Sequence, residues 1–209
     1  MENKQKTDIK SLYDKKPFSV GVRSCDIGLT LNTKAIFFDA FMRDAILTLS
    51  NGVVGHAFIV GNNGDIIEAL GGGVTTTKLA DYVKSDQCVL IFRNMTITDN
   101  DKSNILSYAY GSVGRRYDYT GLLHFLFKGI NADKKDNFCS ENCFESFATR
   151  DIKVSTKDNA QDTTPQDILD FMYLQGALTN DTTKWTLADN QNFNLTKILS
   201  FLMIKNGGV

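Results

Sequence analysis

The sequence predicts a mixed α+β fold, with strands gathered in the middle of the domain and helices on both sides. Short runs of β-forming residues occur within residues 18–31, 55–70 and 87–93. Longer segments, such as 33–52 and 164–178, carry apolar residues at helical spacing. The chain has 209 residues, of which 42% are hydrophobic, and this length is enough for one domain with a full core.

Composition excludes several classes of function. The net charge of −1 leaves no basic surface for a polyanion, so we expect no nucleic-acid partner. Residues 1–17 are polar and lysine-rich and lack an apolar stretch, so we interpret them as a flexible arm and neither a signal peptide nor an anchor. No run of about 18 apolar residues occurs, so we expect no integral membrane association.

The first half of the chain alternates strand and helix signals. Residues 18–31 are typical of one or two short strands, and a helix is expected over 33–52, ending at the Asn51-Gly52 turn. Residues 55–70 contain two β-rich runs around a Gly/Asn turn, which predicts a hairpin. A short amphipathic piece over 75–85 and a strand over 87–93 are expected next.

The second half is mainly helical. We predict a helix over 99–112 opened by an Asp or Asn cap, and another over 138–150. A further helix is expected over 164–178, with Pro165 in its first turn, where the missing N–H has no cost. The tail from 194 onward holds a short amphipathic helix that we expect to dock on the domain.

The four cysteines stand at positions 25, 88, 139 and 143. The chain has no CxxC motif and only two histidines, so a zinc site would need scattered ligands and is not expected. Four cysteines could form two disulfides, but without a secretion signal a reducing compartment and free thiols are the favoured interpretation.

Cys139 is the candidate nucleophile. If a helix begins near it, with Asp136 or Asn137 preparing the first turn, the free backbone N–H groups and the helix dipole favour a thiolate there. Cys143 lies one turn further in, beside aromatic residues, where burial favours the neutral thiol. The alternative is that both cysteines simply pack in the core.

A thiolate nucleophile needs an imidazole, and the candidates are His56 and His124. His124 lies in an apolar stretch typical of a packed histidine, whereas His56 opens a strand, so we favour His56. If the hairpin loop comprises residues 61–63, His56 lies opposite Glu68, which would orient the imidazole. A two-residue loop would send Glu68 to the other face, and a solvated carboxylate is the alternative for this residue.

These pieces, in this order, resemble the circularly permuted branch of the papain-like, NlpC-type amidase superfamily, which includes relatives of lecithin retinol acyltransferase. The resemblance covers residues 20–178 and rests on seven stretches: CDIGLTL, GHAFIV, IIEALGGGV, VLIFR, GRRYDY, FCSENCFESF and TPQDIL. Cys25 departs from the pattern, because family members usually have a glycine there. It could be a rival nucleophile only in the unpermuted order, and its segment is typical of a strand.

The resemblance implies an α+β, circularly permuted papain-like fold with a central antiparallel sheet of about 5–6 strands and helices packed on it. It implies a hydrolase domain over 18–178 followed by an extension over 179–209. By resemblance, Cys139 is the nucleophile, His56 the general base and acid, and Glu68 the orienting residue. Tyr117 resembles a tyrosine of the oxyanion region, and a core aromatic is its alternative role.

The implied activity is a thiol amidase or peptidase that cleaves an amide bond through an acyl-enzyme on Cys139. Peptidoglycan stem peptides are the implied substrate, and no cofactor or metal is needed. The alternatives are an acyltransferase or lipid hydrolase with the same residues, and a non-catalytic phage, virion or binding protein. The lack of a secretion signal favours a cytoplasmic enzyme or a phage-encoded, virion-associated protein.

Overall fold

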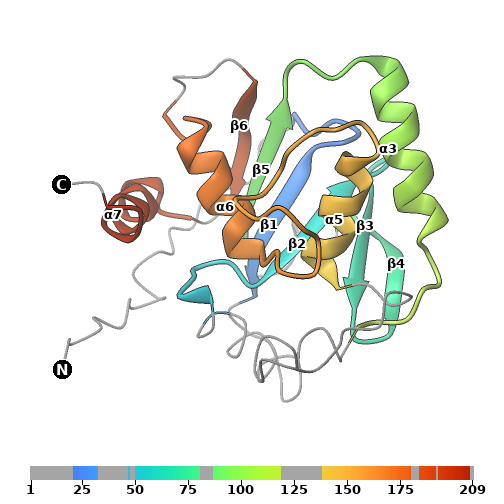
Figure 1. Cartoon of the computed structure of the whole chain (residues 1–209), viewed down its shortest axis with the longest axis horizontal. Helices are drawn as coiled ribbons and strands as arrows, with labels where there is room; N and C mark the ends of the chain where they lie inside the picture. Colours follow the sequence, from blue (N-terminus) through green and yellow to red (C-terminus); the bar gives the residue numbers. More distant parts are fainter. Residues whose placement is uncertain are drawn as a thin grey trace.

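The computed structural model describes residues 21–32, 47, 50–80, 87–118, 138–179, 184–191 and 193–207. These residues form one six-stranded antiparallel sheet in the order β4-β3-β2-β1-β5-β6 (Figure 1), which confirms the predicted central sheet. The strands are β1 (Ile27–Asn32), β2 (His56–Val60), β3 (Asp65–Leu70), β4 (Gly73–Lys78), β5 (Gln87–Asn94) and β6 (Trp185–Gln191).

β1 lies between β2 and β5 in the sheet. Gly28 of β1 pairs directly with Phe58 of β2. A Cβ atom at Gly28 would lie 2.0 Å from the Phe58 ring, so only glycine lets this ring lie across β1. The strand begins two residues later than the predicted stretch from Cys25, because Cys25 occupies a turn with φ 68.

β2 and β3 form the predicted hairpin. Its loop is three residues long and lies between Gly61, whose N–H donates to the Asp65 carbonyl at 2.8 Å, and Asp65 itself. Asn63 and Gly64 have φ values of 56 and 74, a left-handed conformation that Asn and Gly adopt more readily than other residues. The loop has the predicted odd length, but it starts one position later than the predicted 61–63.

β4 corrects the sequence interpretation of residues 75–85. We expected an amphipathic piece there, but its described beginning is a strand that pairs antiparallel with β3 along its whole length. The run Thr75, Thr76 and Thr77 explains the strand, because β-branched side chains favour extended backbone.

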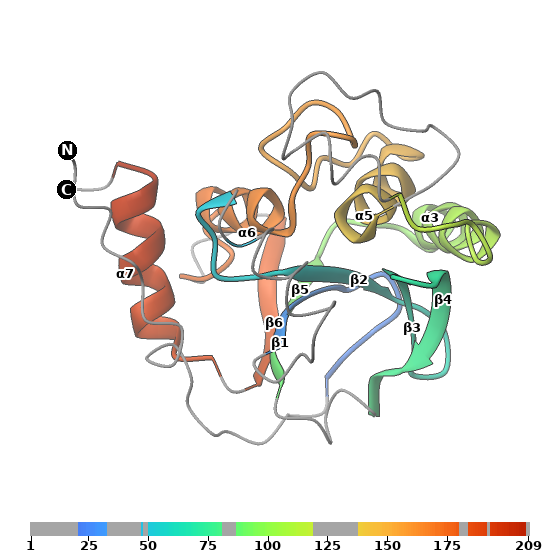
Figure 2. The same cartoon turned by 90° about the horizontal axis from the view of Figure 1, so that it is seen from below.

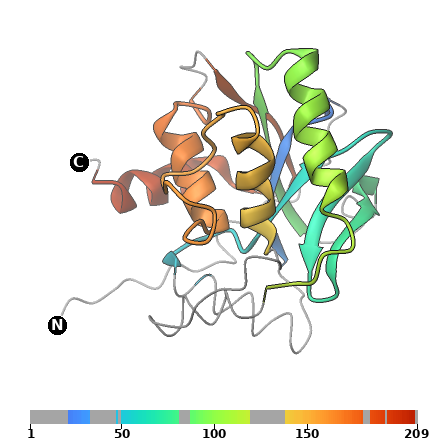
Figure 3. The ribbon, with the colours of Figure 1, turned by 45° about the vertical axis from the view of Figure 1, so that its right-hand side comes forward.

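Three of the described helices lie on one face of the sheet (Figures 2 and 3). They are α3 (Asp99–Gly111), α5 (Cys139–Ala148) and α6 (Pro165–Leu174). This arrangement differs from the expected placement of helices on both sides. The described helix α7 (Leu195–Lys205) lies beside the edge of the sheet formed by β6 (Figure 2).

The helix starts follow capping chemistry. α3 begins after Thr98, whose side chain accepts from the Asp101 N–H, so the cap is a threonine and the predicted Asp or Asn cap is wrong. α6 begins with Pro165, as predicted, after a capping box formed by Thr164 and Asp167.

Most of the predicted helix over 33–52 lies outside the described residues, but its end is described. The Gly52 N–H donates to the Leu47 carbonyl at 2.9 Å, and Asn51 has φ 46. This left-handed residue ends the helix at the predicted turn. The N-terminal arm 1–17 and His124 also lie outside the described residues.

The core has two parts, one on each face of the sheet. The larger part joins the helix-covered face to α3, α5, α6 and α7, and includes Leu29, Ile59, Ile105, Phe147, Ile168 and Leu202. The smaller part lies on the opposite face and includes Phe58, Val60, Ile66, Val89 and Ile91. Alternate residues of β2, β3 and β5 therefore enter different parts of the core, as the period of two requires.

Residues beyond 178 are integrated into the same sheet. β6 pairs antiparallel with β5 from Val89 to Asn94, and Trp185 at its start is only 2% exposed. The boundary between residues 178 and 179 stays a prediction. None of the helices described is long and apolar enough to cross a bilayer.

Candidate active site

Cys139 is the first residue of α5. Its thiol is buried, and the backbone N–H groups of Ala57 and Ser140 donate to it. The start of α5 carries the positive end of the helix dipole. The local backbone therefore favours a negative charge on this sulfur.

His56 opens β2 and lies in the ladder opposite Thr30 of β1. Its side chain is 18% exposed. It hydrogen-bonds to Cys139, and its Nε2 lies 2.8 Å from Oε2 of Glu68. Because Nε2 contacts the carboxylate, Nδ1 is the ring nitrogen left to bond the sulfur.

The two groups shift each other's pKa. Burial alone raises the pKa of the Cys139 thiol, but the charge and hydrogen bond of His56, together with the N–H groups of Ala57 and Ser140, outweigh burial, so the pKa falls below its usual value. Burial alone lowers the pKa of His56, but the Cys139 thiolate and the Glu68 carboxylate raise it above its usual value. Both shifts favour a thiolate–imidazolium pair at neutral pH.

Glu68 reaches His56 along a diagonal of the β2–β3 ladder. Val60 pairs with Ile66 and not with Gly64, so the predicted direct pairing of His56 with Glu68 is wrong by two residues. Because an even shift keeps each side chain on its face, Glu68 still lies on the face of His56. The predicted contact between His56 and Glu68 therefore forms, but between residues that are diagonal neighbours and not a direct pair.

Glu68 is also held from the other side. Its side chain is only 1% exposed, and its Oε1 accepts from the Thr77 hydroxyl of β4 at 2.5 Å. A buried carboxylate with one oxygen on a hydroxyl and the other on an imidazole is fixed in orientation. This burial excludes the solvated-carboxylate alternative for Glu68.

The other three cysteines have the opposite electrostatics. All four thiols are free and buried. Burial raises the pKa of Cys25 and Cys88 to about 12, and that of Cys143 well above its usual value. Cys139 is the one whose pKa is lowered.

Tyr117 lies on the segment that follows α3 and docks on β4. The Gly114 N–H donates to the Val74 carbonyl, and the Val74 N–H donates to the Arg115 carbonyl, each at 2.9 Å. Tyr117 is half-buried and packs against the larger part of the core. Its place in the oxyanion region stays a prediction.

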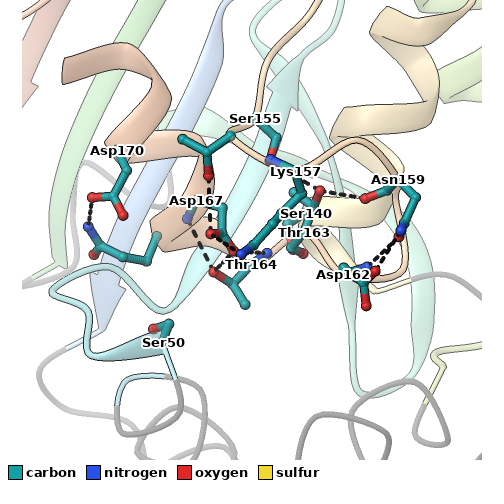
Figure 4. Close-up of polar contacts among 12 residues, drawn as sticks. Ser50, Ser140, Ser155, Lys157, Asn159, Asp162, Thr163, Thr164, Asp167 and Asp170 are labelled. Carbon is teal, nitrogen blue, oxygen red and sulfur yellow. Dashed lines mark hydrogen bonds and ion pairs between the residues drawn. The ribbon is translucent and has the colours of Figure 1, made fainter. Parts of the chain in front are cut away.

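The loop between α5 and α6 anchors the first turn of α5. The Ser140 hydroxyl donates to the Thr163 carbonyl at 2.6 Å, and both residues are fully buried. The Thr163 hydroxyl donates to the Asn159 carbonyl at 2.8 Å and lies 3.2 Å from the Ser155 hydroxyl (Figure 4). These hydrogen bonds hold Ser140, the residue that directly follows Cys139. The sequence analysis did not identify Ser140 or Thr163.

Glu141 is a second residue that the sequence analysis missed. It stands at the third position of α5, where its Oε2 accepts from the Phe138 N–H at 3.3 Å. Asp136 and Asn137, the residues predicted to prepare this turn, lie outside the described residues. The signal was available, because a glutamate three residues after a helix start is half of a capping box.

No group of three or more His, Cys, Asp or Glu residues in the described parts of the chain could hold a metal ion.

Comparison with known proteins identifies the family. The family model described as the permuted papain-like amidase enzyme, YaeF/YiiX, C92 family, matches residues 31–187. The matched segment contains His56, Glu68, Tyr117 and Cys139 and ends before α7. A comparison with curated proteins finds no match. The chain therefore belongs to the permuted papain-like amidase family, whose members are cysteine amidases or peptidases, and is a hydrolase of this class.

Proposed function

We propose that this protein is a thiol amidase that cleaves an amide bond through an acyl-enzyme on Cys139. One observation carries the proposal: Cys139 hydrogen-bonds to His56, and the ring of His56 lies 2.8 Å from the buried carboxylate of Glu68. A nucleophile, a base and an orienting group are thus in contact in one continuous set.

In the first step, the Cys139 thiolate attacks the amide carbonyl carbon and a C–S bond forms. His56, as the imidazolium, gives its proton to the amide nitrogen as the C–N bond breaks. The amine leaves, and the acyl group stays on Cys139 as a thioester. His56 is then neutral, with Glu68 holding the ring in place.

In the second step, His56 takes a proton from water while the water oxygen attacks the thioester carbonyl. The C–S bond breaks, the carboxylic acid leaves, and the thiolate–imidazolium pair is restored. The backbone N–H of Cys139 and the hydroxyl of Tyr117 are the proposed donors to the oxyanion. Loss of one such donor costs about 3 kcal/mol of transition-state stabilisation in enzymes where it has been measured.

We propose peptides of the peptidoglycan-stem type as the substrate class. The amidase chemistry of the family and the resemblance to NlpC-type enzymes support this choice. An acyltransferase would use the same thioester and differs only in the acceptor of the acyl group.

The first test measures the iodoacetamide alkylation rate of each cysteine against pH by peptide mapping, in the wild type and in His56→Ala. We expect Cys139 alone to react fast near pH 6, because its thiolate persists below the usual thiol pKa. In His56→Ala the remaining burial effect raises the pKa of Cys139, so this reactivity should disappear. Cys25 and Cys88 are internal controls, because their pKa values are raised to about 12.

A Cys139 that titrates like an ordinary thiol and ignores His56 would overturn the proposal. If the pair is present, stem peptides are tested next, with Glu68→Ala and Glu68→Gln as matched variants. Release of a new amine with a free carboxylate supports the amidase. Transfer of the acyl group to an added amine or alcohol, without hydrolysis, identifies an acyltransferase instead.

A further inference from the structure

A chain of polar contacts runs from α7 to the entry of β2. Lys205 of α7 places Nζ 2.8 Å from Oδ2 of Asp170 and donates to the Ser50 carbonyl at 3.1 Å. Oδ1 of Asp170 accepts from Nε2 of Gln166 at 2.8 Å, and Oε1 of Gln166 accepts from the Val53 N–H at 2.8 Å. Asp170 on α6 and Ser50 are labelled in Figure 4. The contacts thus join the C-terminal helix to residues far earlier in the sequence.

These polar groups are buried, so each needs a hydrogen-bond or charge partner to offset its loss of hydration. Gln166 and Val53 are fully buried, and the side chains of Asp170 and Lys205 are 8% and 18% exposed. A carboxylate removed from water needs a cation or several donors close to it. Lys205 supplies the cation and Gln166 supplies a donor.

The donors and acceptors in this series of polar contacts also have fixed roles. A glutamine amide can present either its oxygen or its nitrogen to a neighbour, but an ionised carboxylate only accepts hydrogen bonds. Asp170 therefore fixes Nε2 of Gln166 towards itself, which leaves Oε1 for the Val53 N–H. The contact is close, since a Cβ atom at Gly52 would lie 2.7 Å from this oxygen.

Val53 leads directly to His56. Residues 53–55 are buried, and the Gly55 N–H donates to the Thr30 carbonyl at 2.9 Å. The backbone before His56 is thus held by Gln166 at one point and by β1 at the other. A shift at Val53 would move the imidazole relative to Cys139 and Glu68.

We propose that Lys205, Asp170 and Gln166 are positioning residues for His56, and that α7 is thereby part of the active-site framework of this protein. The inference rests on the proposed function, because it assigns a role to residues behind the proposed base. It goes beyond the family, since the matched segment ends at residue 187 and Lys205 lies after it.

The test repeats the alkylation measurement in Lys205→Met, with Lys205→Arg as the conservative variant and Lys197→Met as the matched control. Lys197 lies on the same helix and is exposed. We expect Lys205→Met to slow Cys139 alkylation near pH 6 by about tenfold or more, because small displacements of reacting groups have large effects on rate. Lys205→Arg should retain most of the wild-type rate, and Lys197→Met all of it.

Lys205→Met leaves the Asp170 carboxylate unpaired, so this variant could fail to fold. The double variant Asp170→Leu with Lys205→Met removes both charges and avoids that cost. It still deprives Gln166 of the acceptor that orients its amide, so we expect a folded protein with the same slow alkylation. Its folded state is checked by far-UV circular dichroism.

The outcomes separate the two proposals. A folded double variant with the wild-type pH profile would overturn the positioning role and leave the amidase proposal intact. A wild type without fast Cys139 alkylation would overturn both. Slow alkylation in the folded double variant, with a fast wild type and a fast Lys197→Met, supports the positioning role.

Discussion

Glu141 has a carboxyl group buried in the first turn of the helix that carries Cys139. It is 3% exposed, and burial raises its pKa to about 8. The Phe138 N–H acts against this shift, while the neighbouring Glu145 and Asp118 add to it. The structure therefore holds this group as a neutral acid at the pH where the unfolded chain would ionise it.

Glu141→Gln tests this effect through stability. The unfolded carboxyl loses its proton above about pH 4.5 and the folded one above about pH 8, so the unfolded state binds fewer protons in this window and stability falls as pH rises through it. A glutamine side chain keeps an acceptor for the Phe138 N–H and does not ionise, so its contribution to stability does not fall as the pH rises. We expect it to unfold like the wild type near pH 4.5 and to gain about 2–4 kcal/mol near pH 8.

Urea denaturation at the two pH values measures the gain. Asp158→Asn is the control, since the Asp158 side chain is 95% exposed and is not among the groups that shift the pKa of Glu141. An equal gain for Glu141→Gln at both pH values, or the same pH-dependent gain in the control, would contradict the prediction.

At this scale the sequence predicted the chemically distinctive residues. Cysteine and histidine are rare in this chain, so Cys139 and His56 could be singled out. The alternation of side chains between the two faces of a strand then linked Glu68 to His56. Glu141 could have been identified as half of a capping box, but its burial could not. Gln166 is an ordinary polar residue type, and its importance comes from burial and partners that only the tertiary structure supplies.

The β2–β3 turn shows how an element sets the site. Its three-residue length keeps His56 and Glu68 on one face of the sheet. Gly64 contributes a left-handed backbone at φ 74, and a Cβ atom there would meet nothing within 4 Å. The demand for glycine at this position is therefore conformational and not steric.

Gly64→Ala and Gly72→Ala separate backbone strain from crowding. Both glycines are exposed and have open space around them, but only Gly64 has a positive φ. We expect Gly64→Ala to lower the free energy of unfolding by about 1 kcal/mol, and Gly72→Ala to leave it unchanged or slightly raised. Thermal or urea unfolding measures both, and equal effects would show that turn strain is not the cause.

Among the elements, β5 and α3 agree closely with their predicted ranges, because each has a clear period and a clear start, whereas α6 starts as predicted but ends at Leu174, four residues before the predicted end. The register of the hairpin and the strand character of β4 were not predicted correctly. Register depends on which backbone groups close the loop. β4 is an edge strand whose threonines are half-buried or exposed, and the local pattern does not encode its pairing with β3.

At the scale of the whole molecule, β6 joins the segment after residue 178 to the nucleophile helix. Trp185 at the start of β6 has its ring centroid 5.8 Å from that of Phe147 on α5. Trp185 is the single tryptophan of the chain and is 2% exposed. Its fluorescence therefore reports on the contact between the C-terminal part and the rest of the domain.

We expect Trp185 fluorescence and far-UV circular dichroism to give coincident urea unfolding curves, because β6 pairs with the central sheet and packs on α5. This experiment also tests the predicted boundary at residue 178. A fluorescence transition at clearly lower urea than the dichroism transition would show that residues 179–209 separate from the domain first.

The pair formed by Asp170 and Lys205 also constrains how this sequence can change over time. The aspartate is a buried charge, and the lysine that neutralises it lies on a helix beyond the matched segment of the family. Loss of α7, or of Lys205 alone, would leave a lineage with a costly carboxylate until position 170 also became uncharged. The two positions are therefore expected to covary among relatives, and an aspartate at 170 should mark those that keep the terminal helix.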